Sequence, residues 1–251
     1  MSDTHDTADN PTVVLVHGAF ADASSWNGVI ARLEAEGVEV TAPPNPLRGI
    51  AADSAYVASV FDQIPGPILA VGHSYGGAVI SNAATTAKNV VGLVFVAAFA
   101  PDEGEKLGEI EAGSTDSVLN SALVPRQYPT AEGTATELSI DPAKVRTAFA
   151  GDLSDEQVAL IGATQRPVAE AAFGEPNGPP AWKHLPSWAV VATGDKAAGA
   201  DVVRSMAERA GAKITELEGS HVIMVSQPEA VAGVIVEAVA AVRAGAVATR
   251  A

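Results

Sequence analysis

The sequence predicts an α/β fold in which a mostly parallel, doubly wound sheet carries helices on both faces. Short apolar runs alternate with segments of helical periodicity along most of the chain, an order that is typical of parallel sheets. The run at residues 90–99 is apolar throughout, as expected for a central strand that is covered on both faces. The chain has 251 residues, 47% of them hydrophobic and 18% charged, so it can bury a large core.

The first hundred residues contain three strand–helix units. The expected strands are the apolar runs at residues 13–16, 38–40, 68–71 and 90–99. Four apolar residues have the spacing of one helix face, and a glycine is placed to end that helix: Trp26, Val29, Ile30, Leu33 and Gly37. Two further helices are expected at residues 53–64, with Asp53 as the N-cap, and at residues 76–87.

The alternation stops between residues 101 and 186, a segment rich in proline and acidic residues. Helical spacing is restricted there to short pieces at residues 142–149 and 155–162, so we expect a helical lid inserted into the sheet domain. Strands at residues 188–191 and 213–217, and helices at 201–210 and from 226 onward, complete the core. The expected organisation is a disordered tail at 1–10, a core at 11–100 and 187–251, and the lid at 101–186.

Composition excludes several classes of protein. The formal charge of −15 would repel nucleic acid and anionic membranes, so neither is an expected partner. The absence of cysteine excludes disulfide scaffolds, thiolate metal sites and cysteine nucleophiles. No apolar run reaches the roughly 18 residues of a membrane span. The polar, acidic start does not resemble a signal peptide, and we expect a cytoplasmic protein.

The strongest candidate for chemistry is Ser74, at the centre of a Gly-x-Ser-x-Gly pattern at residues 72–76. The pattern directly follows a predicted strand and precedes a predicted helix, which is the context in which a sharp turn pushes the serine hydroxyl above the sheet. A Gly-rich turn with a bystander serine is the structural alternative. In the functional reading, Ser74 is a nucleophile.

A serine nucleophile needs a general base, and the chain has five histidines to choose from. His5 lies in the tail, His17 ends the first strand, His73 is inside the turn, and His184 precedes a strand. His221 follows the last strand, and so it should lie on the same rim of the sheet as Ser74. We therefore predict that His221 is the base.

The imidazole in turn needs a carboxylate to orient it. Asp195 ends the strand at residues 188–193, and Asp102 is a rival because it also follows a buried strand. The order Ser74, Asp195, His221 matches the order that accompanies this type of turn, so Asp195 is the predicted acid.

The remaining expectations concern the oxyanion and the pocket. The backbone N–H groups of Tyr75 and of Ala19, with Phe20 as the alternative to Ala19, are the expected oxyanion donors. The expected substrate-binding residues are Phe20, Trp26, Phe99 and Val222, although a core role is equally compatible with each. We found no nucleotide-binding or metal-ligand motif, and therefore expect no metal and no cofactor.

Over residues 11–245 the chain resembles the α/β-hydrolase superfamily. Within it, the chain is similar to small esterases of the plant methylesterase and hydroxynitrile lyase type, and to bacterial α/β hydrolases. The segments that carry this resemblance are residues 13–19, 72–77, 193–196 and 219–221. The resemblance implies an α/β-hydrolase fold and supports Asp195 over Asp102. Hydroxynitrile lyases carry a lysine after the catalytic histidine, where this chain has Val222, which argues against cyanohydrin cleavage.

The leading hypothesis is a serine hydrolase that cleaves small esters or lactones through an acyl-enzyme on Ser74. A second hypothesis is a carbon–carbon bond hydrolase or lyase on the same scaffold, with His221 as a base and no acyl-enzyme. A third is a non-catalytic ligand-binding module, which the presence of all three triad residues disfavours.

Overall fold

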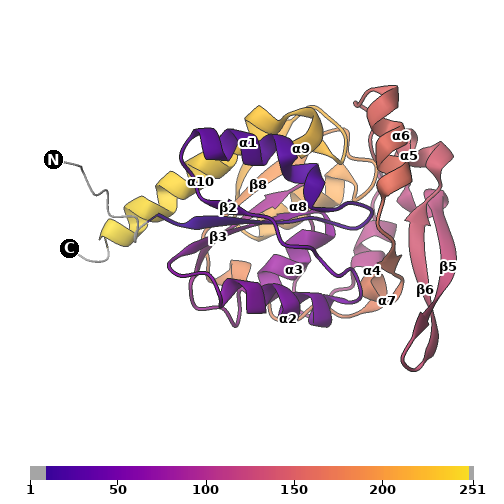
Figure 1. Ribbon diagram of the computed structural model, residues 1–251, viewed down its shortest axis with the longest axis horizontal. Coiled ribbons are helices and arrows are strands. Elements are labelled where there is room, and N and C mark those ends of the chain that lie inside the picture. The colour runs from indigo at the N-terminus through magenta and orange to yellow at the C-terminus, as the bar shows by residue number, and fades with distance from the viewer. Residues whose placement is uncertain (1–9, 249–251) are drawn as a thin grey trace.

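A six-stranded parallel sheet forms the centre of the computed structural model, which describes residues 10–248 (Figure 1). The strands lie in the order β2-β1-β3-β4-β8-β9, and every neighbouring pair is parallel. Their bounds are β1 Thr12–Val16, β2 Val40–Thr41, β3 Ile68–His73, β4 Val90–Val96, β8 Ser187–Ala192 and β9 Lys213–Leu217. The predicted doubly wound α/β fold is confirmed. The predicted tail lies, apart from Asn10, outside the described residues.

Helices cover both faces of this sheet. Helices α1 (Asn27–Ala35) and α10 (Pro228–Ala248) pack against each other on one face, and α2 (Ile50–Phe61) and α3 (Tyr75–Ala83) pack on the other (Figure 1). Helix α8 (Ala200–Arg209) connects β8 to β9 and packs on both. Gly37 follows α1 with a φ of +73°, so the predicted helix stop is confirmed. No helix within residues 10–248 has the length and apolar character to cross a bilayer.

Asp53 is not the N-cap of α2, so that prediction was wrong. The helix begins at Ile50, and Asp53 lies in its first turn with its side chain fully buried. Its carboxylate accepts hydrogen bonds from the backbone N–H groups of Arg48 and Gly49 at 3.0 and 3.4 Å. The side chain therefore turns back and fixes the loop that precedes the helix.

Residues 101–186 lie between β4 and β8, and we call this segment the cap. It contains the expected short helices α5 (Val145–Ala148) and α6 (Asp155–Thr164), together with α4 (Leu107–Ala112) and α7 (Ala171–Gly174). It also contains a three-stranded antiparallel sheet, which the expectation of a helical lid did not include. The strands of that sheet are β5 Leu123–Thr130, β6 Gly133–Ile140 and β7 Val168–Ala169.

The sequence pattern did not predict the cap sheet because prolines interrupt its first strand, β5. Pro125 and Pro129 both lie in β5, which is an edge strand of the cap sheet. Proline has no N–H to donate, so edge strands tolerate it and central strands do not.

Candidate active site

Ser74 lies at the sharp turn between β3 and α3, in a backbone conformation that residues other than glycine rarely adopt. Its φ is 52° and its ψ is −124°. The flanking glycines make this turn possible. A Cβ atom on Gly72 would lie 2.5 Å from the Gly76 carbonyl oxygen, and one on Gly76 would lie 2.5 Å from that of Val16. The two glycines thus permit a close-packed turn at the carboxyl end of β3.

The structure brings His221 and Asp195 together. His221 Nδ1 donates to Asp195 Oδ2 over 2.7 Å, and each of the two side chains is 1% exposed. The second carboxylate oxygen accepts from the N–H groups of Ala197 and Ala198 at 2.8 and 3.0 Å. With Nδ1 donating to Asp195, Nε2 of a neutral imidazole is the nitrogen whose lone pair can act as a base.

Asp102, the rival carboxylate, lies elsewhere. It forms an ion pair with Lys183, and this contact lowers the pKa of its carboxyl. The pair joins the start of the cap to its end, and within residues 10–248 Asp102 has no hydrogen bond or ion pair to His221. Of the two aspartates considered, Asp195 is the one that contacts the His221 imidazole.

His73, which directly precedes Ser74 in the chain, contacts His221. His73 Nε2 donates to the His221 carbonyl oxygen over 3.0 Å, and the two imidazole rings have centroids 4.7 Å apart. Among residues 10–248, no hydrogen bond joins Ser74 Oγ to His221. Such bonds are often long in unliganded sites and shorten when substrate is bound.

Backbone donors surround Ser74. Tyr75 begins α3, and its N–H has no acceptor within the described part of the chain, as is usual for the first turn of a helix. The N–H groups of Ala19 and Phe20 also have no acceptor among residues 10–248. Their turn lies against the serine, because a Cβ atom on Gly18 would be 2.6 Å from Ser74 Cβ. Phe20 itself has a strained φ of 61°.

His17 has a structural position beneath this turn. Its Nδ1 donates to the Gly18 carbonyl oxygen over 2.9 Å, and its Nε2 accepts from the Asn45 N–H over 2.9 Å. Burial lowers the pKa of His17 to about 4, and the nearby Arg166 adds to the effect. His17 is therefore a neutral hydrogen-bonding link between the 18–20 turn and the loop before α2.

Tyr75 also anchors α3 through its side chain. Its hydroxyl donates to Asp53 Oδ2 over 2.8 Å, and both residues are fully buried. Burial raises the pKa of Asp53, although the hydrogen bond from Tyr75 acts in the opposite direction. Sequence reasoning missed this contact. The available signal was a carboxylate at 53 on the same helical face as the apolar Val57 and Phe61.

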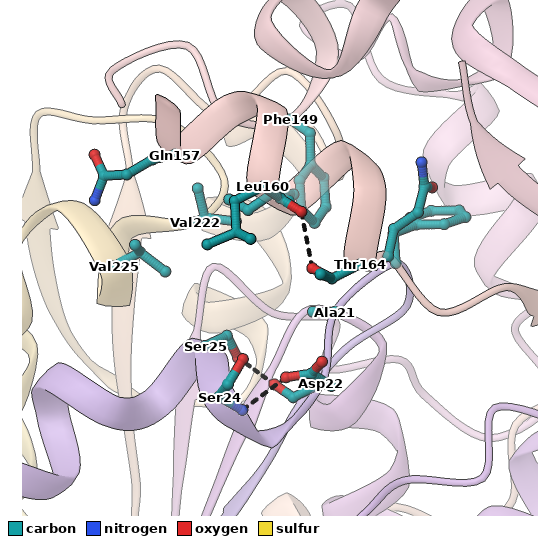
Figure 2. A pocket seen from close by; sticks show the side chains of 13 residues that line it. Ala21, Asp22, Ser24, Ser25, Phe149, Gln157, Leu160, Thr164, Val222 and Val225 are labelled. Carbon is teal, nitrogen blue, oxygen red and sulfur yellow. Dashed lines mark hydrogen bonds between the residues drawn. The ribbon is translucent and has the colours of Figure 1, made fainter. Parts of the chain in front are cut away.

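An apolar pocket of about 160 Å³ lies between the core and helix α6 of the cap, and Ser74, Asp195 and His221 are not among its lining residues (Figure 2). Phe149 lines the pocket and also packs against the imidazole: its ring centroid is 5.1 Å from that of His221 and 6.2 Å from that of Phe20. The lining residues are Phe20, Ala21, Asp22, Ser24, Ser25, Phe149, Gln157, Leu160, Ile161, Thr164, Gln165, Val222 and Val225.

Two of the four predicted pocket residues, Phe20 and Val222, line this cavity. The other two, Trp26 and Phe99, are not among its lining residues. Trp26 is fully buried with its ring 6.3 Å from that of His73, and Phe99 is 3% exposed. No group of three or more histidine or carboxylate side chains in residues 10–248 is placed to hold a metal ion.

These features define a class of protein: a doubly wound α/β domain with a strained serine turn, a buried histidine–aspartate pair and an inserted cap. The chain matches the model of the alpha/beta hydrolase family over residues 13–234, and it belongs to that family.

A sequence relative is the putative chloroplastic methylesterase 11 of Arabidopsis thaliana, 27% identical over 172 residues. The match covers 62% of this chain and 44% of that relative, so the chain spans less than half of its length.

Solved structures share the fold at lower identity. Polyneuridine aldehyde esterase has a TM-score of 0.77 at 23% identity, covering 91% of this chain and 98% of its own. A pyrethroid hydrolase from Sphingobium faniae JZ-2 has a TM-score of 0.75 at 23% identity, with coverages of 92% and 98%. A methylesterase from Arabidopsis has a TM-score of 0.76 at 19% identity, with coverages of 92% and 99%.

Proposed function

We propose that this protein is a serine hydrolase that cleaves small carboxylic esters or lactones. The observation that carries the proposal is the buried hydrogen bond between His221 and Asp195, beside the strained turn of Ser74. A neutral imidazole with its Nδ1 held by a carboxylate is the arrangement that makes Nε2 a base for a serine hydroxyl. The names of the related esterases and methylesterases support the same reaction class.

In the proposed reaction, Ser74 Oγ attacks the ester carbonyl carbon while its proton passes to His221 Nε2. The N–H groups of Tyr75 and Ala19 stabilise the negative oxygen that forms, and Asp195 stabilises the imidazolium. The imidazolium then protonates the departing alkoxide, which leaves as an alcohol. Water, deprotonated by His221, attacks the acyl carbon, and the carboxylic acid is released as Ser74 regains its proton.

The pocket favours substrates with a compact, uncharged apolar group. Phe20, Phe149 and Ile161 supply apolar lining, whereas Asp22 is the one charged residue of the lining. A negatively charged substrate group would meet the Asp22 carboxylate. We therefore expect neutral esters of short acyl chains, or lactones of similar size, to be the better substrates.

Turnover of p-nitrophenyl acetate and butyrate without added metal tests this proposal. We expect Ser74→Ala to lose about 10⁴-fold or more in kcat, because no other group forms the acyl-enzyme. Ser81→Ala is the matched control: Ser81 is a fully buried serine of α3 whose hydroxyl has no hydrogen-bond partner within the described residues, so its loss should leave activity intact. Equal turnover in wild type and Ser74→Ala would refute the proposal.

A second candidate is a carbon–carbon bond hydrolase or lyase in which His221 acts as the base without an acyl-enzyme. The observation in its favour is that no hydrogen bond joins Ser74 Oγ to His221 in the described chain. An activity that survives Ser74→Ala but is lost in His221→Ala would identify this reaction class.

A further inference from the structure

The loop that carries His221 is held from the cap as well as from the core. On the core side, His73 donates to the His221 carbonyl oxygen, and the Gly194 N–H donates to the Gly219 carbonyl oxygen over 2.9 Å. On the cap side, Asp152 accepts two hydrogen bonds from Ser220, the residue next to His221. These two bonds span 3.0 Å from the Ser220 N–H and 2.5 Å from its hydroxyl.

We propose that Asp152 is a positioning residue for His221: through Ser220, it sets the place of the imidazole relative to Ser74. The proposal rests on the proposed function, because it assigns Asp152 a part in the same reaction. Asp152 does not itself reach the reacting atoms. It acts on the backbone of the loop that presents the base.

The geometry around Asp152 is built for this contact. Gly219 lets the carboxylate approach the loop, since a Cβ atom there would lie 2.8 Å from Asp152 Oδ2 and 2.4 Å from Ile223 Cδ1. Burial acts to raise the pKa of Asp152, but hydrogen bonds from Ser220, together with weaker ones from Ser226 and the backbone, lower the pKa overall. The carboxylate is thus ionised when it accepts both bonds, and such charge-assisted bonds are stronger than neutral ones.

The same stretch of cap also contacts the imidazole directly. Phe149, three residues before Asp152, packs its ring 5.1 Å from the His221 ring and meets Phe20 edge-on at 6.2 Å. The segment 149–152 therefore touches His221 with one residue and holds its neighbour Ser220 with another. Correct docking of the cap and correct placement of the base are coupled through these two contacts.

The test is a comparison of kcat and KM for a p-nitrophenyl ester in Asp152→Ala and Asp152→Asn. The alanine variant loses both bonds, and we expect kcat to fall about tenfold or more with KM changed less than threefold. Asparagine can accept from the Ser220 N–H and donate to its hydroxyl, so it should restore kcat to within about threefold of wild type. Glu132→Ala is the control, since Glu132 is an exposed cap carboxylate in the β5–β6 turn whose side chain has no hydrogen bond or ion pair among residues 10–248.

A double variant separates positioning from simple destabilisation. If Asp152 acts through Ser220, the kcat losses of Asp152→Ala and Ser220→Ala should be less than multiplicative in the combined variant. An unchanged kcat in Asp152→Ala, or losses that multiply fully, would overturn the proposal. Because Ser74-dependent turnover is measured in the wild type first, failure here is distinct from failure of the proposed hydrolase function.

Discussion

Ser74 holds a backbone conformation that costs about 1–3 kcal/mol for a residue with a side chain. The surrounding glycines do not relieve that strain; they permit it, because any larger residue at 72 or 76 would clash with backbone atoms. Three peptide N–H groups around this turn, those of Ala19, Phe20 and Tyr75, have no acceptor among residues 10–248.

Stored strain at Ser74 predicts a difference between two inactive variants. Ser74→Gly removes the hydroxyl and lets the backbone relax, whereas Ser74→Ala removes the hydroxyl and keeps the strain. We expect the glycine variant to exceed the alanine variant in free energy of unfolding by about 1 kcal/mol, measured by urea denaturation. A glycine variant that is the less stable of the two would show that the turn is not strained.

At the scale of elements, α2 and α3 are joined by one buried polar contact. Tyr75 directly follows Ser74 at the start of α3, and its hydroxyl donates to Asp53 of α2. Since Asp53 also accepts from the loop before α2, three segments meet at one carboxylate. The orientation of the first turn of α3 therefore depends on a side chain that is distant in sequence.

Removing the tyrosine hydroxyl should destabilise the fold through this carboxylate. Tyr75→Phe leaves Asp53 buried with one donor fewer, so we expect the free energy of unfolding to fall by about 1–3 kcal/mol in urea denaturation. Tyr56→Phe is the control, because that tyrosine is 39% exposed and lies on the same helix as Asp53. Equal effects of the two substitutions would contradict the assigned role of the contact.

Periodicity and strand ends were sufficient to predict the core and its candidate residues. Asp195 and His221 each follow a strand, and parallel strands bring such positions to one rim. The cap is different, because β5 carries two prolines and its partner β6 is buried only over its last three residues. Asp53 was given the wrong role and Asp152 was missed for another reason: each acts through a contact whose partner the local pattern does not reveal.

At the scale of the whole molecule, two buried histidines link stability to pH. Burial lowers the pKa of His17 to about 4 and that of His73 well below its ordinary value. Both are therefore neutral in the folded protein, whereas in the unfolded chain they bind protons below about pH 6.5. Asp53 acts in the opposite direction, because burial raises its pKa and the folded state retains its proton more readily.

Stability should therefore fall as the pH drops from about 6.5 toward 4. The unfolded state binds more protons in this window, and each histidine contributes a slope of up to about 1.4 kcal/mol per pH unit. Carboxyl groups with lowered pKa values, such as Asp201 at about 2, stabilise the folded protein when ionised. That stabilisation is lost only below this pH window. Urea denaturation at pH 7, 6 and 5 measures the slope, and His17→Gln should reduce it. Stability that rises on acidification would contradict this account.

The central claim is that His221, held by Asp195, activates Ser74, and a fluorophosphonate labelling experiment tests it most directly. Mass spectrometry of the labelled peptide identifies the modified residue, and the rate of labelling reports the activation of its hydroxyl. We expect labelling on Ser74 in the wild type, none on that peptide in Ser74→Ala, and a rate at least about 100-fold lower in His221→Ala. Labelling at another residue, or an unchanged rate in His221→Ala, would contradict the account.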